Sequence, residues 1–206
     1  NIVRNIHKKY LDGENLTRED VQAIVEDTFY LPYANSKMEQ NMLESAKKSV
    51  DMYFEKNKAD FKNIEMAEAD IELDMGDGIK VNGRIDLVKH REISGEEKIT
   101  IVDFKTADRD VTQCLEAEQL KIYALGYQEL TGKSADYLEI LNLDKVESER
   151  VRVTEGLTET VAKDIRNAAQ NIRENKLDRT CSKEKCSACY LNYLCLSKEE
   201  KKTYVE

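Results

Sequence analysis

The sequence has no run of apolar residues that could cross a membrane. No stretch approaches the ~18 to 20 consecutive apolar residues that a bilayer-spanning helix needs. No charged-then-apolar leader with a small-residue cleavage site stands at the start. We therefore expect a soluble, cytoplasmic protein with no membrane partner. The chain begins at Asn1 in a charged amphipathic stretch, NIVRNIHKKY, which suggests a piece of a longer protein.

The sequence also lacks an excess of basic residues. Lysine and arginine number 32 against 41 aspartates and glutamates, and the net charge is -9. This balance argues against a protein that holds nucleic acid by bulk electrostatic attraction alone. It does not exclude a nuclease, because carboxylates that bind metal add negative charge and basic residues can cluster locally.

Cysteine is absent from residues 1 to 113, and proline occurs once, at Pro32. Four of the five cysteines fall between Cys181 and Cys195. Disulfide frameworks spread their cysteines through a small secreted fold, so crowding of this kind in a reducing compartment suggests a bound metal. There is no internal repeat, low-complexity tract or long linker, and 206 residues predict one domain with appendages.

Hydrophobic spacing predicts helices at residues 2–10, 17–29 and 36–58, the second opened by a capping box of Thr17 and Asp20. From Ile64 the pattern changes to that of a β-hairpin, IEMAEADIELDM and IKVNGRIDLVKH, turned at GDG. A second turn, SGEE, leads into KITIVDFKT. The nearly continuous apolar run in that segment predicts a central strand covered on both faces.

Helical spacing returns at residues 113–130, with Gly132 as the stop, and strands at 137–142 and 148–153 and a helix at 157–175 are predicted to follow. This order predicts an α/β fold with a central mixed sheet flanked by helices. We divide the chain into a helical N-terminal segment (1–58), a core (59–177) and a cysteine-rich metal-binding segment (178–206).

Three side chains at two neighbouring strand ends form the candidate reaction centre. Asp86 lies in GRIDLV, and Asp103 and Lys105 lie in IVDFKT, where strand alternation puts both on one face. Adjacent carboxylates repel unless a divalent cation neutralises them, and hard oxygen ligands suit Mg²⁺ or Mn²⁺. A metal and an ammonium group together can activate water against a phosphodiester.

A bare D-x-K triplet also occurs by chance, and solvated strand-end carboxylates beside a surface lysine are the alternative interpretation. The context favours the metal site. The triplet closes a central strand, a second aspartate closes the preceding strand, and an amphipathic helix follows.

GRIDLV, IVDFKT and the stretch from Gln119 to Tyr123 resemble the RecB-type branch of the PD-(D/E)xK nucleases, which includes RecB and AddAB enzymes, CRISPR-associated spacer-acquisition nucleases and helicase-fused exonucleases. The resemblance covers roughly residues 60 to 195. It implies a restriction-endonuclease-like core and an Mg²⁺- or Mn²⁺-dependent deoxyribonuclease, an exonuclease more than an endonuclease. It also implies DNA and helicase domains as partners, in repair or recombination.

By this resemblance Asp86 and Asp103 would ligate the metal, the main-chain carbonyl of Phe104 would add a ligand, and Lys105 would assist the attacking water. Two further positions match the branch. Gln119 and Tyr123 fit its Q-x-x-x-Y motif and would touch DNA or brace Lys105, although Tyr123 can also be a core aromatic. Glu68 lies where the branch often carries a strand glutamate, and a solvated glutamate is the alternative.

The resemblance also implies a metal-binding histidine on an early helix, which the stretch from Asn35 to Tyr53 lacks. His7 and His90 do not match that position, and His90 is expected to follow a strand at the surface. Glu39 or Gln40 could take the histidine's place. This departure leaves a second function open, a catalytically weakened module that binds DNA or braces a helicase.

The spacing Cys181-x4-Cys186-x2-Cys189-x5-Cys195 supplies four thiolates, enough for a [4Fe-4S] cluster or a structural Zn²⁺. The single C-x2-C knuckle disfavours a zinc ribbon, and the spacing resembles the iron-sulfur staple of AddB and its relatives. Those relatives take their first cysteine from before the nuclease core, where this sequence has none. The fourth ligand is therefore either Cys181 or a cysteine in chain that precedes Asn1. Reduced cysteines without a metal, or a zinc-binding interaction domain with a coincidental D-x-K, are the other interpretations.

Overall fold

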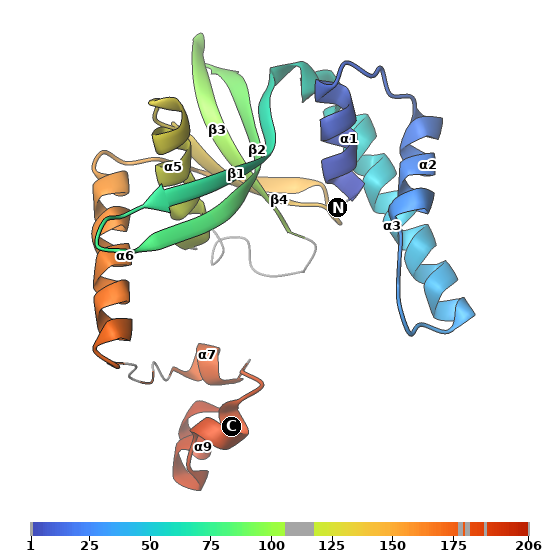
Figure 1. The fold of residues 1–206 in the computed structure, drawn as a ribbon. Coiled ribbons are helices and arrows are strands. Elements are labelled where there is room, and N and C mark those ends of the chain that lie inside the picture. Colours follow the sequence, from blue (N-terminus) through green and yellow to red (C-terminus); the bar gives the residue numbers. More distant parts are fainter. Residues whose placement is uncertain (1, 106–117, 177–178, 180–181, 188, 206) are drawn as a thin grey trace. The chain divides into compact units, whose positions relative to one another are not determined.

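The computed structural model describes the chain except for residues 1, 106–117, 177–178, 180–181, 188 and 206. The chain separates into two compact units, Asn1–Arg166 and Asn167–Glu206. The first unit holds a five-stranded sheet and the helices on its faces, and the second holds the cysteine-rich tail (Figure 1). None of the helices in the described ranges has the length and apolar character that a membrane span requires.

The first unit opens with helices α1 (Ile2–Leu11), α2 (Arg18–Thr28) and α3 (Ser36–Asn57), followed by the 3₁₀ helix η1 (Lys58–Asn63). The predicted capping box is present, because the Thr17 side chain accepts from the Asp20 amide and Asp20 accepts from the Thr17 amide. Asn35 caps α3 by accepting from the Met38 amide at 2.9 Å. Each cap satisfies amides that the helix itself leaves unpaired, which fixes where the helix begins.

The sheet runs in the order β1 (Ile64–Asp74), β2 (Lys80–Ile93), β3 (Glu96–Lys105), β4 (Tyr137–Asn142) and β5 (Glu147–Arg152). Adjacent strands are antiparallel except β3 and β4, which are parallel. The mixed sheet and the central position of β3 confirm the predicted α/β fold. The parallel pair requires a crossover, and α5 (Glu118–Thr131) lies within it.

Each face of the sheet carries its own apolar cluster, and helices cover both faces (Figure 1). The N-terminal helices pack on one face, and we call their cluster the helical-face cluster; it includes Tyr53, Leu87 and Val102. α5 packs on the other face in the α5-face cluster, which includes Ile85 and Ile101. Ile101 and Val102 are neighbours in β3 and fully buried on opposite faces. This two-sided burial explains the continuous apolar run of the central strand.

Helix α6 (Leu157–Arg173) follows β5 and packs through Val161 against Leu73 and Leu125. The second unit contains short helices α7 (Lys183–Ser187), α8 (Asn192–Cys195) and α9 (Lys198–Tyr204), which we had not predicted. Hydrophobic spacing missed these helices because they are shorter than the window in which periodicity can be detected. A capping box of Ser197 and Glu200 fixes the start of α9.

Candidate active site

Carboxylates from three neighbouring strands lie at one level of the sheet. Glu68 of β1 and Asp86 of β2 lie between the paired residues Ala67↔Leu87 and Ala69↔Ile85. On the other side of β2, Leu87 pairs with Val102, so Asp103 is the next residue along β3. Glu68, Asp86 and Asp103 therefore follow one another across the sheet.

Strands β1 and β2 change face at this level. Ile85 packs in the α5-face cluster and Leu87 in the helical-face cluster, although regular alternation would put residues two apart on the same face. The same switch separates Ala67 from Ala69 in β1. Glu68, at the switch, has a backbone φ of 53° in the left-handed region. A local irregularity of this kind re-aims side chains, and here it affects the residue beside Asp86.

The Asp103 carboxylate is buried and pairs with Lys105. Its side chain is 3 % exposed, and Lys105 Nζ lies 2.6 Å from Asp103 Oδ2. Burial raises the pKa of the Asp103 carboxyl above its ordinary value, Lys105 opposes this shift, and the negative charge of Asp86 adds to it. The site therefore holds a desolvated carboxylate next to a second one, an arrangement that a bound cation would stabilise.

Asp86 is tied to the backbone of β3. Its Oδ2 accepts a hydrogen bond from the Phe104 amide at 2.9 Å. The Lys105 carbonyl accepts from the Leu143 amide and so points toward the β4 side. Because backbone groups alternate along a strand, the Phe104 carbonyl points toward β2 and Asp86. The Phe104 carbonyl, which the resemblance implies as a metal ligand, is therefore directed toward Asp86.

A chain of side-chain hydrogen bonds connects α5 to Lys105. Lys105 Nζ donates to Gln119 Oε1 at 3.3 Å, and Gln119 Nε2 donates to the Tyr123 hydroxyl at 2.6 Å. Burial raises the pKa of Tyr123, so the phenol stays protonated and its own proton is available for donation. The Tyr123 ring belongs to the α5-face cluster and is 7 % exposed. Tyr123 is thus a core aromatic whose hydroxyl also meets Gln119.

Glu68 faces two arginines rather than solvent alone. Arg4 Nη1 lies 3.6 Å and Arg84 Nη1 lies 3.9 Å from Glu68 Oε2, and the glutamate side chain is 20 % exposed. Arg84 also donates to Asp70 at 2.6 Å. Sequence patterns gave no signal for Arg4, because it meets Glu68 only after α1 packs beside β1.

The oxygen donors of Asp86, Asp103 and the Phe104 carbonyl fit a hard divalent cation, with water completing its shell. No three histidine, cysteine, aspartate or glutamate side chains form a ready metal-binding group in the part of the chain that the structure describes. The Asp103 carboxylate is instead paired with Lys105. The donor chemistry fits Mg²⁺ or Mn²⁺, with carboxylate ligands from two strands.

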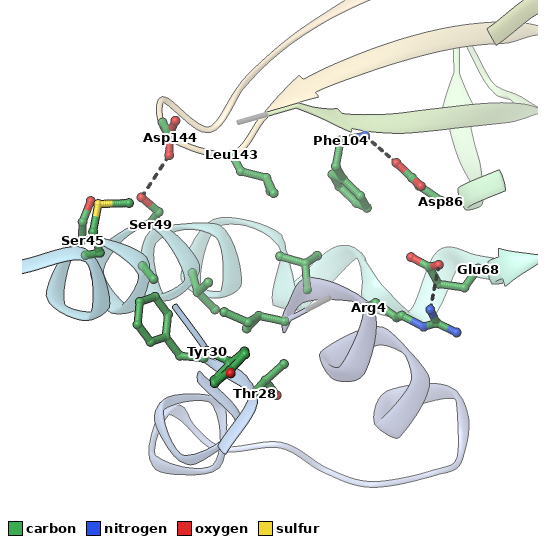
Figure 2. Close-up of a pocket in the computed structure, with 16 residues that line it drawn as sticks. Arg4, Thr28, Tyr30, Ser45, Ser49, Glu68, Asp86, Phe104, Leu143 and Asp144 are labelled. Carbon is green, nitrogen blue, oxygen red and sulfur yellow. Dashed lines mark hydrogen bonds and ion pairs between the residues drawn. The ribbon is translucent and has the colours of Figure 1, made fainter. Parts of the chain in front are cut away.

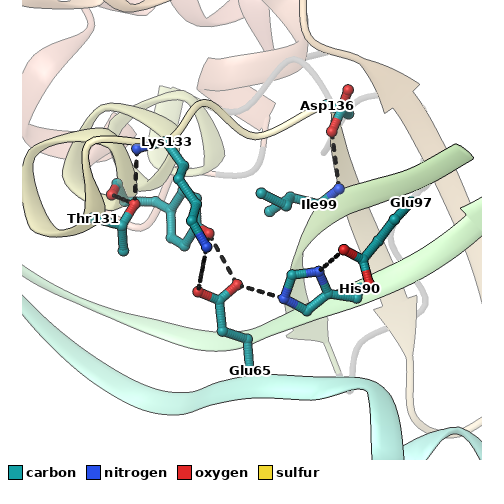
Figure 3. A network of polar contacts seen from close by, with 8 residues as sticks. Glu65, His90, Glu97, Ile99, Thr131, Lys133 and Asp136 are labelled. Atoms are coloured by element: carbon teal, nitrogen blue, oxygen red, sulfur yellow. Dashed lines mark hydrogen bonds and ion pairs between the residues drawn. The ribbon is translucent and has the colours of Figure 1, made fainter.

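Neither histidine lies at this site. His7 is fully buried, its Nε2 is 2.7 Å from the Tyr53 hydroxyl, and its ring packs near Phe61 and Phe104. The expectation that His90 follows a strand is wrong, because it lies inside β2, with Nε2 3.0 Å from a Glu65 oxygen (Figure 3). Strand β2 continues past its apolar residues Leu87 and Val88 and includes His90, because β2 pairs with β3 as far as Ile93 and Glu96.

The two residues that could replace the missing histidine are Glu39 and Gln40. Both are exposed on the first turns of α3. Neither is among the described residues that line the pocket containing Glu68 and Asp86.

Three cysteines of the described residues lie in the second unit. Cys186 is buried, Cys189 and Cys195 are exposed, and all three are free thiols. Backbone hydrogen bonds from the Cys189 amide to the Cys186 carbonyl and from the Asn192 amide to the Cys189 carbonyl fold this segment tightly. Cys181 and Cys114 lie outside the described residues.

Comparison with known proteins gives one family and two similar folds. The model of the PD-(D/E)XK nuclease superfamily matches residues 2–196. The crystal structure of SSO0001 is 19 % identical, with a TM-score of 0.43 over 94 % of this chain and 80 % of that one. A protein from Eubacterium rectale, provisionally named an exonuclease, is 11 % identical, with a TM-score of 0.47 over 95 % and 73 %. At these identities the likeness concerns the fold alone. No curated protein matches the chain.

Proposed function

Because this chain belongs to the PD-(D/E)XK nuclease superfamily, we propose that it hydrolyses DNA phosphodiester bonds with a divalent metal held by Asp86 and Asp103. The observation that carries the proposal is the meeting of β2 and β3. There the Asp86 carboxylate accepts a hydrogen bond from the Phe104 amide. The residues before and after Phe104 in β3 are Asp103, with a buried carboxylate, and Lys105, whose ammonium pairs with it.

Each residue has a distinct role in this proposal. A divalent ion held there would supply the Lewis acidity and positive charge that phosphodiester hydrolysis requires. Lys105 donates to the attacking water and to the negative charge that develops on the phosphate. Gln119 orients the Lys105 ammonium, and the Tyr123 hydroxyl orients Gln119. Gln119 and Tyr123 thus position Lys105 and do not react themselves.

Glu68 completes the carboxylate row in the proposal. Its pairing with Arg4 and Arg84 neutralises it, which lowers the repulsion that a third carboxylate would add beside Asp86. Glu68 would therefore support the site without strongly repelling Asp86 and Asp103, the two residues that would hold the metal.

The finer parts of the proposal rest on the resemblance of GRIDLV, IVDFKT and the Q-x-x-x-Y motif to the RecB-type branch. They are action from DNA ends, an association with helicase domains, and a role in repair or recombination. The second candidate function is a catalytically weakened module that binds DNA or braces a helicase. That candidate is favoured because His7 contacts Tyr53 and His90 contacts Glu65, so neither histidine adds a ligand beside Asp86 and Asp103.

We expect the purified protein to degrade linear DNA when Mg²⁺ or Mn²⁺ is added and to stop when EDTA is added. Gel analysis of end-labelled substrates measures this, and a closed circular DNA of equal mass separates action at ends from internal cuts. An RNA of the same sequence tests the preference for DNA. Binding of DNA without any cleavage, under all of these conditions, would favour the weakened module instead.

For the tail we propose that Cys181, Cys186, Cys189 and Cys195 hold a [4Fe-4S] cluster, with Zn²⁺ as the alternative. Three of these cysteines lie within the short helical unit, and Cys186 is buried there. Metal-ligand bonds that form only in the folded state would stabilise this unit, whose exposed surface includes Tyr190 and Leu194.

Anaerobically purified protein is expected to be brown and to contain about four irons per chain, because four thiolates close the shell of one such cluster. Cys189→Ser should bleach it and make residues 178–206 protease-sensitive. Metal analysis and limited proteolysis provide the measurements, with Ser187→Ala as a control that leaves the thiolates intact. Stoichiometric zinc would identify Zn²⁺ as the bound metal. Unchanged protease resistance in metal-free protein would contradict the proposal that a metal stabilises residues 178–206.

A further inference from the structure

Residues on both faces of the sheet reach the candidate active site. On the helical side, Glu68, Asp86 and Phe104 line a pocket of about 710 Å³ between the N-terminal helices and the sheet (Figure 2). On the side of α5, Gln119 meets the Lys105 ammonium at 3.3 Å. This distance is at the long end for a hydrogen bond, so a small shift of α5 away from the sheet would break the contact. The distance of α5 from the sheet therefore decides whether Gln119 can orient Lys105.

Helix α5 approaches β1 more closely than a side chain at position 126 would allow. Gly126 is buried, and a methyl group in its place would lie 2.5 Å from Ile71 Cδ1, 2.9 Å from Cγ2 and 3.1 Å from Cβ. Carbon atoms in contact ordinarily stay ~3.5 to 4.0 Å apart. Rotation of the Ile71 side chain can move Cδ1 and Cγ2, but Cβ is fixed to the backbone of β1. Gly126 thus lets the backbone of α5 rest directly on Ile71.

The Ile71 side chain has no room to yield toward the sheet. Ile71 pairs with Gly83 of β2, where a methyl group would lie 3.3 Å from both Cδ1 and Cγ1 of Ile71. Its side chain fills the space that Gly83 and Gly126 leave open, and Ile71 is 3 % exposed. A side chain added at either glycine would therefore press on Ile71 and, through it, move α5 away from the sheet.

A second contact holds the other end of α5. The Tyr127 hydroxyl donates to both carboxylate oxygens of Glu65, at 2.9 and 3.2 Å, and Glu65 also meets His90 (Figure 3). Gln119 lies about two helical turns before Gly126. Because the Tyr127 end is held, a displacement at Gly126 should move mainly the end that carries Gln119.

We infer that Gly126 and Ile71 are positioning residues for the candidate active site; this rests on the proposed nuclease function. Their contact sets the distance of α5 from the sheet and so keeps Gln119 against Lys105. Alanine forms helices more readily than glycine does. The close approach to Ile71, and not helix formation, thus explains a glycine in the middle of α5.

Gly126→Ala is expected to lower the rate of metal-dependent DNA cleavage at saturating substrate about tenfold, the effect of losing one hydrogen bond to a charged group. Ile71→Ala makes room for the new methyl group, so the double variant should cleave as fast as Ile71→Ala alone. In a Gln119→Ala background, Gly126→Ala should cause no further loss, because the contact that it breaks is already absent. Leu130→Ala is the control, since Leu130 is 52 % exposed on the same helix, and should leave the rate unchanged.

A spectroscopic readout tests the position of Gln119 without any cleavage. In protein labelled with ¹⁵N-glutamine, Gln119→Glu removes one side-chain amide signal from the NMR spectrum and so identifies it. This signal should shift in Gly126→Ala and return toward its wild-type position when Ile71→Ala is added. Gly83→Ala presses on Ile71 from the sheet side, so it should shift the signal and lower the rate by less than Gly126→Ala does.

A Gly126→Ala protein that cleaves at the wild-type rate, or whose Gln119 signal does not move, would overturn the inference. Equal losses from Gly126→Ala in the wild-type and Gln119→Ala backgrounds would also overturn it, because the glycine would then only support the fold. If the wild type cleaves no DNA, the nuclease proposal fails, and the Gln119 signal alone decides whether Gly126 positions this residue. If Gly126→Ala does not fold, the rate and the Gln119 signal of Gly83→Ala decide in its place.

Discussion

Asp103→Asn is expected to reduce metal-dependent DNA cleavage by about 10³-fold, because it removes one of two carboxylates that would hold the metal. The fold should persist, since asparagine has the same shape and can still accept from Lys105 Nζ. Burial raises the pKa of Asp103, which means that the charged form is unfavourable in the folded protein. The variant should therefore melt at the same temperature as the wild type or slightly higher.

Lys105→Met should cause a loss of similar size, because it removes the ammonium that is proposed to act on the attacking water. The matched control is Lys98→Met, which lies near the other end of β3 and pairs there with Glu96 at 2.7 Å. Initial rates on end-labelled DNA and melting temperatures are measured for all three variants. Undiminished cleavage by Asp103→Asn or Lys105→Met would remove the active-site assignment, and loss of cleavage in Lys98→Met would mean that the strand tolerates no change.

Acid is expected to destabilise the protein through His7. Burial lowers the pKa of this histidine to about 3, and the positive charge of Lys89 contributes to the shift. The neutral ring lies among Tyr53, Phe61 and Phe104, where a charged ring would be costly. The unfolded chain binds the proton near pH 6.5, so lowering the pH favours unfolding.

The sign and the pH window follow from that depressed pKa. The contribution of His7 to stability is complete above about pH 6.5 and is lost as pH falls toward about 3. The free energy of unfolding should fall by about 1.4 kcal/mol for each pH unit within the window, or roughly 2 kcal/mol between pH 6.5 and pH 5. Urea unfolding followed by circular dichroism at several pH values measures this slope.

Two variants isolate the histidine from other acid-sensitive groups. Tyr53→Phe removes the hydroxyl that meets His7 Nε2 and should keep the slope, because the ring stays buried. The double variant His7→Leu with Tyr53→Phe leaves no polar atom of the pair in the core and should flatten the slope. Carboxylates with lowered pKa values, such as Asp60, contribute equally to the pH dependence of the free energy of unfolding in both variants. Parallel stability curves for the two variants would contradict the prediction.

Local signals explain why much of the fold could be predicted. Thr17 and Asp20 mark a helix start through bonds within one turn, and Gly132, with a φ of 70°, ends α5 where only glycine adopts that conformation readily. The apolar run of β3 identified a strand covered on both faces. The helices of residues 183–204 escaped notice because each is only one or two turns long.

The candidate catalytic triplet was likewise visible in the sequence, because Asp103 and Lys105 share a face of one strand through the alternation that every strand has. The switch of face at Glu68 and Asp86 could not be predicted. It depends on a left-handed backbone residue within a strand and on two apolar clusters that residues far apart in the chain build together. Periodicity describes a regular strand and carries no information about where the strand departs from it.

The sequence by itself determined the order of the longer helices and strands, the central strand, and the residue types at the candidate reaction centre. These depend on contacts within a strand, a turn or a helix, which neighbouring residues decide. Only the tertiary structure decided that Gln119 meets Lys105, that His7 is buried in the core, and that Arg4 faces Glu68 in the pocket that Asp86 also lines. Each of these contacts joins separate elements, and the free energy that forms it comes from packing the whole sheet and its helices.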